Sequence, residues 1–366
     1  MKLGIVGLPN VGKTTLFNAL THAHAAATAY AYTSAESNMG VVAVPDTRLD
    51  RLNDVLETPR KVNATIDVVD IAGLAEGASR GEGLGNRFLA DIRGVDAVAH
   101  VVRVFSNAEV AHVRDENDPL ADVELVETEL VLSDLELVER RIDKTRKAAR
   151  SGDKAAGREL AVLEALVAAL LEGKIARAVE RSADDAALFR ELALVSDRPM
   201  LFVLNTDDGT APEEALAAHT SFVEWAHGRG DQVVAVAARL EAELADLEPE
   251  DAAEFRAELG AGDAGAVDVL LRAAYEVLGY ITFFTGDFRS SESRAWQLPR
   301  GWTAKQAAGR IHSDIEHGFV RAQVVGIEDL IELGSFHAAR ERALVRTEGK
   351  EYVVQDGDVI NFMHTG

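Results

Sequence analysis

The chain has 366 residues, of which 47% are hydrophobic and 27% charged, a composition typical of a globular protein with two or three domains. It contains no cysteine, which excludes disulfide bonds and thiolate metal sites. A net charge of −23 argues against nucleic-acid binding by the surface as a whole but leaves room for a local basic patch. No apolar run approaches about 18 uncharged residues and the sequence opens with a strand, so we expect no membrane span, no signal peptide and a cytoplasmic protein.

Residues 7–14 match the phosphate-loop pattern G-x-x-x-x-G-K-[ST], directly after a predicted apolar strand, Leu3–Val6, and before a predicted helix. Glycines in such a loop let backbone N–H groups face a polyphosphate at the positive end of the helix. Lys13 reaches the β- and γ-phosphates, and the Thr14 hydroxyl is a ligand for Mg²⁺. A nucleotide site is therefore predicted here. Its residues in this loop are Asn10, Val11, Gly12, Lys13, Thr14 and Thr15.

Up to about residue 120, β-branched runs alternate with helical stretches, which predicts a mostly parallel sheet with crossover helices. After Leu3–Val6, these runs are Val41–Val44, Ala64–Asp70 and Ala97–Val104. The run that ends at Asp70 opens a D-x-x-G motif, in which Asp70 holds Mg²⁺ through water and the Gly73 amide senses the γ-phosphate. The glycine-rich residues 76–85 that follow suit a loop that reorganises when this phosphate leaves, or a passive surface loop.

A long charged helix is predicted from about residue 121, with Leu125, Leu132, Leu135 and Ile142 at heptad-like positions. A turn follows at 151–157. A second helix then carries Leu160, Leu163, Val167 and Leu170. Two such helices joined by a short loop predict an antiparallel helical hairpin, inserted as residues 121–197.

The tip of this hairpin is basic: residues 140–158 contain eight Lys or Arg against two acids. The cluster is either a solvated helix face with salt bridges or a contact for a phosphate backbone. For the second interpretation, the candidate RNA or ribosome contacts are Arg146, Lys147 and Arg150.

The α/β pattern resumes with a strand at Pro199–Leu204, a helix near 213–229 and a strand at Gln232–Ala237. Asn205, Thr206 and Asp208 stand where switch GTPases carry N-K-x-D, whose carboxylate reads guanine and whose lysine stem covers the base. Thr206 replaces that lysine. Ala237 and Ala238 are expected in the second base-side loop.

After Gly279 the chain becomes rich in β segments, which predicts a small α+β domain of about 85 residues. The predicted strands are Tyr280–Thr285, Arg294–Leu298, Phe319–Val325 and Tyr352–Phe362, with a helix near Thr303–His312.

Together these motifs resemble those of the YchF/Obg-like ATPase family, and the resemblance covers essentially the whole chain. The matching segments are Gly7–Lys13, Asp70–Leu74, Gly81–Asn86, His100–Arg103, Ala307–His312 and Gln355–Val359. The resemblance implies an α/β, Ras-like P-loop NTPase domain made of residues 1–120 and 198–278. It also implies the helical insertion at 121–197 and a C-terminal TGS domain of β-grasp type at 279–366.

The resemblance implies ATP in preference to GTP, because the family carries N-x-x-E in place of N-K-x-D. This chain departs from that pattern, since Asp208 supplies a carboxylate of the kind that reads guanine. An Obg-type GTPase is therefore kept as an alternative. Residues 31–34 also replace the family's Pro-Phe-x-Thr, so that Ser34 takes the Mg²⁺-binding hydroxyl, with Thr33 as the substitute.

Ras-type GTPases orient the attacking water with a Gln after D-x-x-G, but Leu74 in that position cannot hydrogen-bond to water. Another group must take this role, or the chain hydrolyses the nucleotide very slowly on its own. The resemblance implies His112 as the catalytic residue, although its sequence context alone is that of an ordinary loop histidine. His100 lies in an apolar strand and is more typical of a core residue.

We expect a Mg²⁺-dependent ATPase switch that hydrolyses ATP to ADP and phosphate and binds ribosomes, on the large subunit, or structured RNA. We expect no membrane partner and a monomer. The other alternative is a ribosome- or nucleic-acid-binding adaptor in which hydrolysis is incidental. A metabolic kinase is disfavoured, because no lid-like Arg cluster follows the phosphate loop.

Overall fold

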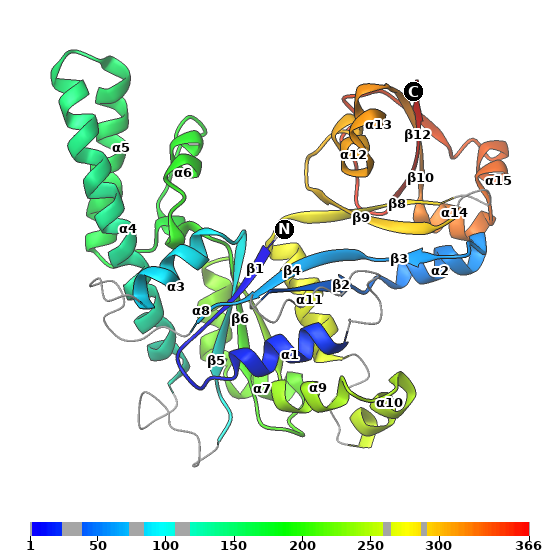
Figure 1. Ribbon diagram of the computed structural model, residues 1–366, viewed down its shortest axis with the longest axis horizontal. Helices are drawn as coiled ribbons and strands as arrows, with labels where there is room; N and C mark the ends of the chain where they lie inside the picture. Colours follow the sequence, from blue (N-terminus) through cyan, green and yellow to red (C-terminus); the bar gives the residue numbers. More distant parts are fainter. Residues whose placement is uncertain are drawn as a thin grey trace. The chain divides into compact units, whose positions relative to one another are not determined.

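The computed structural model describes residues 2–23, 39–72, 84–106, 118–258, 265–286 and 291–365. Contacts between Cα atoms divide the chain into two units. The first contains Met1–Ala23 and Asp67–Leu270, and the second contains Val41–Ile66 and Leu271–Gly366. Figure 1 labels their elements. Among the described residues, no helix is long and apolar enough to cross a membrane.

A sheet of strand order β2-β4-β1-β5-β6-β7 forms the centre of the first unit, although most of β2 and the start of β4 are grouped with the second unit. From β4 to β7 all neighbours are parallel, as predicted. The strands are β1 (Lys2–Val6), β2 (Met39–Val44), β4 (Ala64–Asp70), β5 (Ala97–Arg103), β6 (Met200–Asn205) and β7 (Gln232–Val236). Every residue of β5 and β6 is buried, which explains their largely apolar character.

Helices connect these strands or follow the last of them, and α1 and α9 lie side by side (Figure 1). The helices are α1 (Lys13–Ala23), α3 (Leu84–Arg93), α7 (Pro212–Ala218), α8 (Thr220–Gly228), α9 (Ala238–Leu244), α10 (Pro249–Glu258) and α11 (Ala266–Val277). The predicted single helix at 213–229 is two helices, α7 and α8, that meet at His219.

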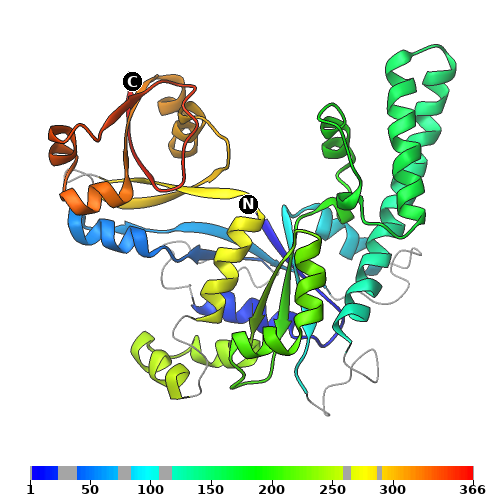
Figure 2. The ribbon, with the colours of Figure 1, turned by 180° about the vertical axis from the view of Figure 1, so that it is seen from behind.

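The predicted hairpin is present as α4 (Pro119–Arg150) and α5 (Lys154–Leu171), which project together from the first unit (Figure 2). Asp118 caps the start of α4 by accepting a hydrogen bond from Ala121 N, and a proline follows at the first helical position. Asp153 caps α5 by accepting from Ala155 N and Ala156 N. The turn between the helices is thus fixed by local capping. Three short helices complete the insertion: η3 (Ala176–Ala178), α6 (Ala186–Leu192) and η4 (Val195–Asp197).

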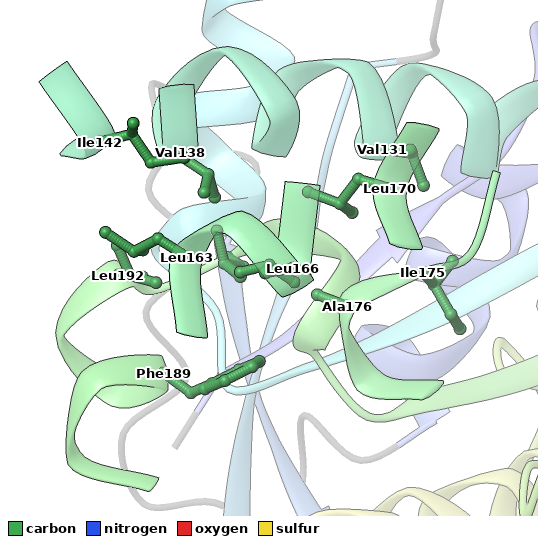
Figure 3. Close-up of a cluster of buried hydrophobic side chains, with 11 residues drawn as sticks. Val131, Val138, Ile142, Leu163, Leu166, Leu170, Ile175, Ala176, Phe189 and Leu192 are labelled. Atoms are coloured by element: carbon green, nitrogen blue, oxygen red, sulfur yellow. The ribbon is translucent and has the colours of Figure 1, made fainter. Parts of the chain in front are cut away.

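The hairpin is held by a cluster of buried apolar side chains (Figure 3). On α4 they are Val131, Val138 and Ile142, and on α5 they are Leu163, Leu166 and Leu170. With the partly buried Leu135, the α4 positions are spaced four, three and four residues apart, which is the heptad pattern. The predicted positions Leu135 and Ile142 are confirmed. The predicted Leu132 is wrong, because it is 39% exposed and its neighbour Val131 occupies the seam.

The second unit contains a sheet of strand order β11-β10-β12-β8-β9-β3. Its strands are β3 (Lys61–Val62), β8 (Tyr280–Thr285), β9 (Ser293–Pro299), β10 (Phe319–Gly326), β11 (Arg346–Glu348) and β12 (Asp358–His364). Its helices are α2 (Thr47–Leu56), α12 (Ala304–Ile311), α13 (Ser313–His317), α14 (Ile327–Leu333) and α15 (Phe336–Glu341). The prediction of one strand over 352–362 is corrected: β12 begins at Asp358, because Gly357 turns the backbone with a φ of 86°.

The segment from α2 to β3 belongs with the C-terminal residues, which differs from the predicted boundary that placed residues 41–66 in the nucleotide domain. β3 pairs in parallel with β9. Arg48 of α2 donates to Asp356 at 2.6 Å, and Arg51 forms a bidentate pair with Glu328 at 2.7 and 3.0 Å. An alternation of strands and helices in the sequence does not tell which sheet a strand joins.

Candidate nucleotide-binding site

The phosphate loop connects β1 to α1, and its backbone requires glycine at two places. Gly7 has a φ of 152°, and a Cβ added there would lie 2.5 Å from the Val101 carbonyl oxygen. Gly12 has a φ of 98°, and a Cβ added there would lie 2.2 Å from Asn205 Nδ2. The pattern recognised in the sequence therefore reflects both the loop conformation and the close approach of the neighbouring strands.

Lys13 is held inside this loop. Its Nζ donates to the Leu8 carbonyl oxygen at 2.7 Å, and the side chain is buried. Burial lowers the pKa of Lys13 to about 8, and the Asp70 carboxylate offsets part of this effect. The ammonium group is thus already positioned within the phosphate loop, in surroundings that favour a polyphosphate as its counter-charge.

Thr14 and Asp70, the two described residues predicted to hold Mg²⁺, are in contact: Thr14 Oγ1 donates to Asp70 Oδ2 at 2.8 Å. Asp70 reaches this place because β4 pairs with β1 and sets Asp70 opposite Ile5. A hydroxyl beside a carboxylate fits Mg²⁺, which is commonly bound by one or two protein oxygens together with water and substrate phosphates. The predicted Ser34 and Gly73, and the substitute Thr33, lie outside the described residues.

A cavity of about 520 Å³ extends from the phosphate loop. Most predicted nucleotide-binding residues line it. The lining consists of Asn10, Gly12, Lys13, Thr14, Thr15, Phe105, Ser106, Asn205, Thr206, Asp207, Asp208 and Arg239. A space of this size lies within the range of small-molecule sites.

Asn205 connects three loops around the cavity. Its Nδ2 donates to the Val11 carbonyl oxygen at 2.8 Å, and its Oδ1 accepts from Ala238 N at 3.0 Å. Val11, Ala237 and Ala238 are buried behind the lining rather than part of it. Asn205 thereby ties the loop after β6 to the phosphate loop and to the start of α9.

The end of the cavity formed by the loop after β6, called the base end after its predicted role, contains two acids, each with a partner of its own. Ser106 N donates to both carboxylate oxygens of Asp207 at 3.1 Å. Arg239 pairs with Asp208, with its Nε donating to Oδ2 at 2.6 Å and its Nη2 donating to the same oxygen. The sequence did not reveal Phe105, Ser106 or Arg239. The sequence feature that could have indicated Arg239 is its position, because it is a cation directly after Ala237 and Ala238.

Of the two histidines considered for catalysis, the structure describes His100 but not His112. His100 is buried in β5 with its ring 5.7 Å from that of Phe202, and burial lowers its pKa to about 3. This confirms the expectation of a core histidine, although its buried Nδ1 has no hydrogen-bond partner among the described residues. His112 and Leu74 lie outside the described residues, so the catalytic role of His112 stays a prediction.

The predicted contact residues at the hairpin tip are not equivalent. Arg146 is shared between Asp143 at 3.9 Å and Glu164 at 3.4 Å. Lys147 and Arg150 are exposed and form no ion pair with any described residue. The same holds for Lys144, Lys154 and Arg158. The tip therefore presents several cations that the hairpin itself does not neutralise.

Two protein families match parts of the chain. A family described as "50S ribosome-binding GTPase" matches residues 2–133, and a YchF C-terminal family described as "Protein of unknown function (DUF933)" matches residues 280–365. The "Ribosome-binding ATPase YchF" of Bacillus subtilis is 44% identical over 360 residues, 98% of this chain and 98% of its own length. Its Escherichia coli namesake is 44% identical over 363 residues, 99% and 98% of the two chains.

Among solved structures, that of the Schizosaccharomyces pombe YchF GTPase matches with a TM-score of 0.86 at 32% identity. The match covers 99% of this chain and 97% of that chain. The shared fold thus extends over the nucleotide site, the hairpin and the C-terminal residues. Identity at this level over nearly the full length of both proteins shows that the chain belongs to the YchF family of P-loop NTPases.

Proposed function

We propose that the chain is a ribosome-binding ATPase that hydrolyses ATP to ADP and phosphate and acts as a nucleotide-controlled switch. The observation that carries this proposal is the cavity lined by Lys13 and Thr14, with Asp70 hydrogen-bonded to Thr14 beside it. The curated relatives named ribosome-binding ATPases support the choice of nucleotide and partner.

The phosphate end supplies most of the binding energy in this proposal. Lys13 exchanges its bond to the Leu8 carbonyl for contacts with the β- and γ-phosphates, while the loop amides hold the other oxygens. Thr14 and Asp70, together with Ser34, would hold Mg²⁺, whose charge neutralises the phosphate oxygens. Gly73 is proposed to contact the γ-phosphate. The other proposed contacts are Asn10, Val11, Gly12, Thr15, Asn205, Thr206, Asp208, Ala237 and Ala238.

His112 is proposed to orient the attacking water or to stabilise developing charge, because Leu74 cannot do so. His112→Ala should lower turnover with little change in ATP affinity, which is the signature of a contact made in the transition state. His227→Ala, which removes an exposed histidine of α8, is the matched control and should leave turnover unchanged. Equal turnover in both variants would remove His112 from the mechanism.

An Obg-type GTPase is the second candidate, and Asp208 is the observation that favours it. The absence of the guanine-covering lysine opposes it, since Thr206 is buried and too short to extend over a base. The names of similar proteins include both activities, since curated relatives are named as ATPases and the yeast structure is described as a GTPase. The pairing of Asp208 with Arg239 supports ATP.

The partner surface is proposed to lie at the hairpin tip and in the C-terminal residues. Lys147 and Arg150, with Arg146 beside them, would contact ribosomal RNA through its phosphates, on the large subunit. The mixed sheet and the packing of α12 against it support a TGS domain of β-grasp type at 279–366. We further propose a monomeric, cytoplasmic protein.

One calorimetric series tests the function. MgATP and MgGTP are titrated separately into the full chain, and each titration is repeated with purified large and small ribosomal subunits present. We expect ATP to bind more tightly than GTP and the large subunit to change the ATP affinity. Tighter binding of GTP would favour the Obg-type alternative. Failure to bind either nucleotide would contradict both hydrolase proposals.

A further inference from the structure

The ion pair between Asp208 and Arg239 occupies the position from which a nucleobase is read. Arg239 donates twice to one oxygen of Asp208, Oδ2, through Nε and Nη2. Within the described residues, the other oxygen accepts no hydrogen bond. Asp208 is 26% exposed and Arg239 is 70% exposed, and both line the nucleotide cavity.

The neighbouring acid does not compensate for this pairing. Both oxygens of Asp207 accept from Ser106 N, which fixes its carboxylate to the loop after β5. Asp207 is therefore oriented toward the loop after β5, and Asp208, at the fourth position of the motif, is left as the carboxylate that would face the base. Arg239 reaches Asp208 because α9 starts directly after β7, the strand that pairs with β6.

Guanine and adenine place different demands on this position. Guanine presents two adjacent N–H donors, and a carboxylate satisfies both only when both of its oxygens are available. Adenine presents one amino donor beside a ring nitrogen that accepts, and a bare carboxylate repels that acceptor. A carboxylate whose charge is balanced by a guanidinium group does not, and the guanidinium adds N–H donors at the same place.

We propose that Arg239 is a specificity-determining residue, which favours ATP over GTP by occupying Oδ2 of Asp208. The inference rests on the proposed function for its choice of nucleotides. It reconciles the guanine-type carboxylate at Asp208 with a family whose curated members are named as ATPases. It also predicts that base selectivity in this chain depends on a residue outside the loop motif.

The test removes the guanidinium and measures binding to the full chain. Dissociation constants for MgATP and MgGTP are obtained by displacement of a fluorescent nucleotide, for the wild type and Arg239→Gln. Releasing one charged acceptor should lower the ratio of GTP to ATP dissociation constants by about tenfold or more, chiefly through tighter GTP binding. The double variant Arg239→Gln/Asp208→Asn should lose that gain, because the carboxylate is then absent.

A matched control removes another arginine from an ion pair of the same unit. Arg181 donates to both oxygens of Asp197 at 2.9 Å, away from the cavity lining. Arg181→Gln should leave the GTP-to-ATP ratio unchanged. Circular dichroism of each variant verifies that the fold is kept.

Salt provides a second readout. Exposed ion pairs weaken as ionic strength rises, whereas screening of the phosphates acts equally on ATP and GTP and cancels in the ratio. For the wild type, the ratio of GTP to ATP dissociation constants should therefore fall as salt is added. For Arg239→Gln, the same ratio should stay constant.

An unchanged ratio in Arg239→Gln with normal ATP binding would overturn the inference alone. A gain in GTP affinity that persists in the double variant would overturn the route through Asp208. A wild type that prefers GTP contradicts the proposed ATPase, yet the shift on removing Arg239 is still measured and decides the inference. Loss of binding for both nucleotides in the wild type overturns both.

Discussion

The two ends of the nucleotide cavity are built by different means. At the phosphate end, β1, the loop and the start of α1 lie within a few residues of one another, and backbone conformation at Gly7 and Gly12 shapes the site. At the base end, Asp208 meets a partner 31 residues further along the chain. The first end is therefore local in sequence, and the second depends on the pairing of β6 with β7.

Because of this difference, we expect nucleotide affinity and selectivity between bases to depend on different residues. The proposed contacts of the phosphate end are with the triphosphate and metal, which all nucleoside triphosphates share. The base end is proposed to distinguish one base from another through the paired side chains of Asp208 and Arg239. A single substitution at the base end is thus expected to change the preferred nucleotide, whereas changes at the phosphate end should affect every nucleotide alike.

The largest expected effect comes from Lys13→Ala. Lys13 makes charge-assisted contacts worth about 1.5–3 kcal/mol each, so losing two of them should weaken ATP and GTP binding equally, by roughly a hundredfold or more. Calorimetry with both nucleotides measures the effect, and circular dichroism should show an intact fold. If a folded Lys13→Ala protein bound ATP and GTP with wild-type affinity, the assignment of the phosphate end would be contradicted.

Asn205→Ala should have the next largest effect, because this residue joins the two ends. Its removal leaves the Val11 carbonyl and the Ala238 N–H buried without a partner, at a cost of about 1–3 kcal/mol in the free energy of unfolding. Affinity for ATP and GTP should fall together. Denaturant unfolding and nucleotide titration measure the two effects, and Asn18→Ala, on an exposed position of α1, is the control.

A selective change in the ratio of ATP to GTP affinity in Asn205→Ala would contradict this view. It would mean that Asn205 acts at the base end rather than as the connection between loops.

The sequence predicted local features well. The phosphate loop, the parallel strands, the paired helices and the strand Tyr280–Thr285 all depend on motifs or periodicities within a short window. Two of the errors of detail, those at Leu132 and at the start of β12, have local causes. Leu132 and Val131 are both apolar neighbours, so the spacing alone did not decide which faces α5. The start of β12 depends on the turn at Gly357.

Features that depend on distant partners could not be predicted from the sequence. The pairing of β3 with β9 joins residues more than two hundred positions apart. The hydrogen bonds of Asn205 to Val11 and Ala238 require the finished sheet. Arg239 looks like an ordinary helix residue until β7 brings it beside Asp208. For this reason, base selectivity is the property of the site that the sequence predicts least well.

The pH dependence of binding should distinguish the two ends more finely. Because burial lowers the pKa of Lys13 to about 8, the nucleotide-free protein loses this charge as the pH rises above about 8. A bound triphosphate requires the charged form, so binding then takes up a proton. The dissociation constants should rise by up to about tenfold per pH unit, equally for ATP and GTP. Titration between pH 7 and 9.5 measures this.

Calorimetry in buffers of different ionisation enthalpy should detect the proton uptake directly. Lys13→Arg keeps its charge throughout this range, so its affinity, although weaker, should not depend on pH. A change in the ATP-to-GTP ratio with pH would place the titrating group at the base end instead.

Substitutions at the hairpin tip are expected to have the smallest effect on nucleotide binding and hydrolysis. Reversing the charge of Arg146, Lys147 and Arg150 to Glu should leave nucleotide affinity and hydrolysis by the free protein unchanged. The reason is distance: α4 has 32 residues, so its tip lies about 45 Å along the helix from its first turn.

The same triple variant should bind ribosomes more weakly and with a shallower dependence on salt, because fewer counterions are released on binding. Co-sedimentation with ribosomes over a range of salt concentrations measures both quantities. A second triple variant, with the same three residues changed to Gln, should show an intermediate loss of ribosome binding, because it removes the charges without reversing them. Arg146→Glu alone should have the least effect, because Asp143 and Glu164 already share its charge. If the triple variant co-sediments like the wild type at every salt concentration, the contact lies in the C-terminal residues instead.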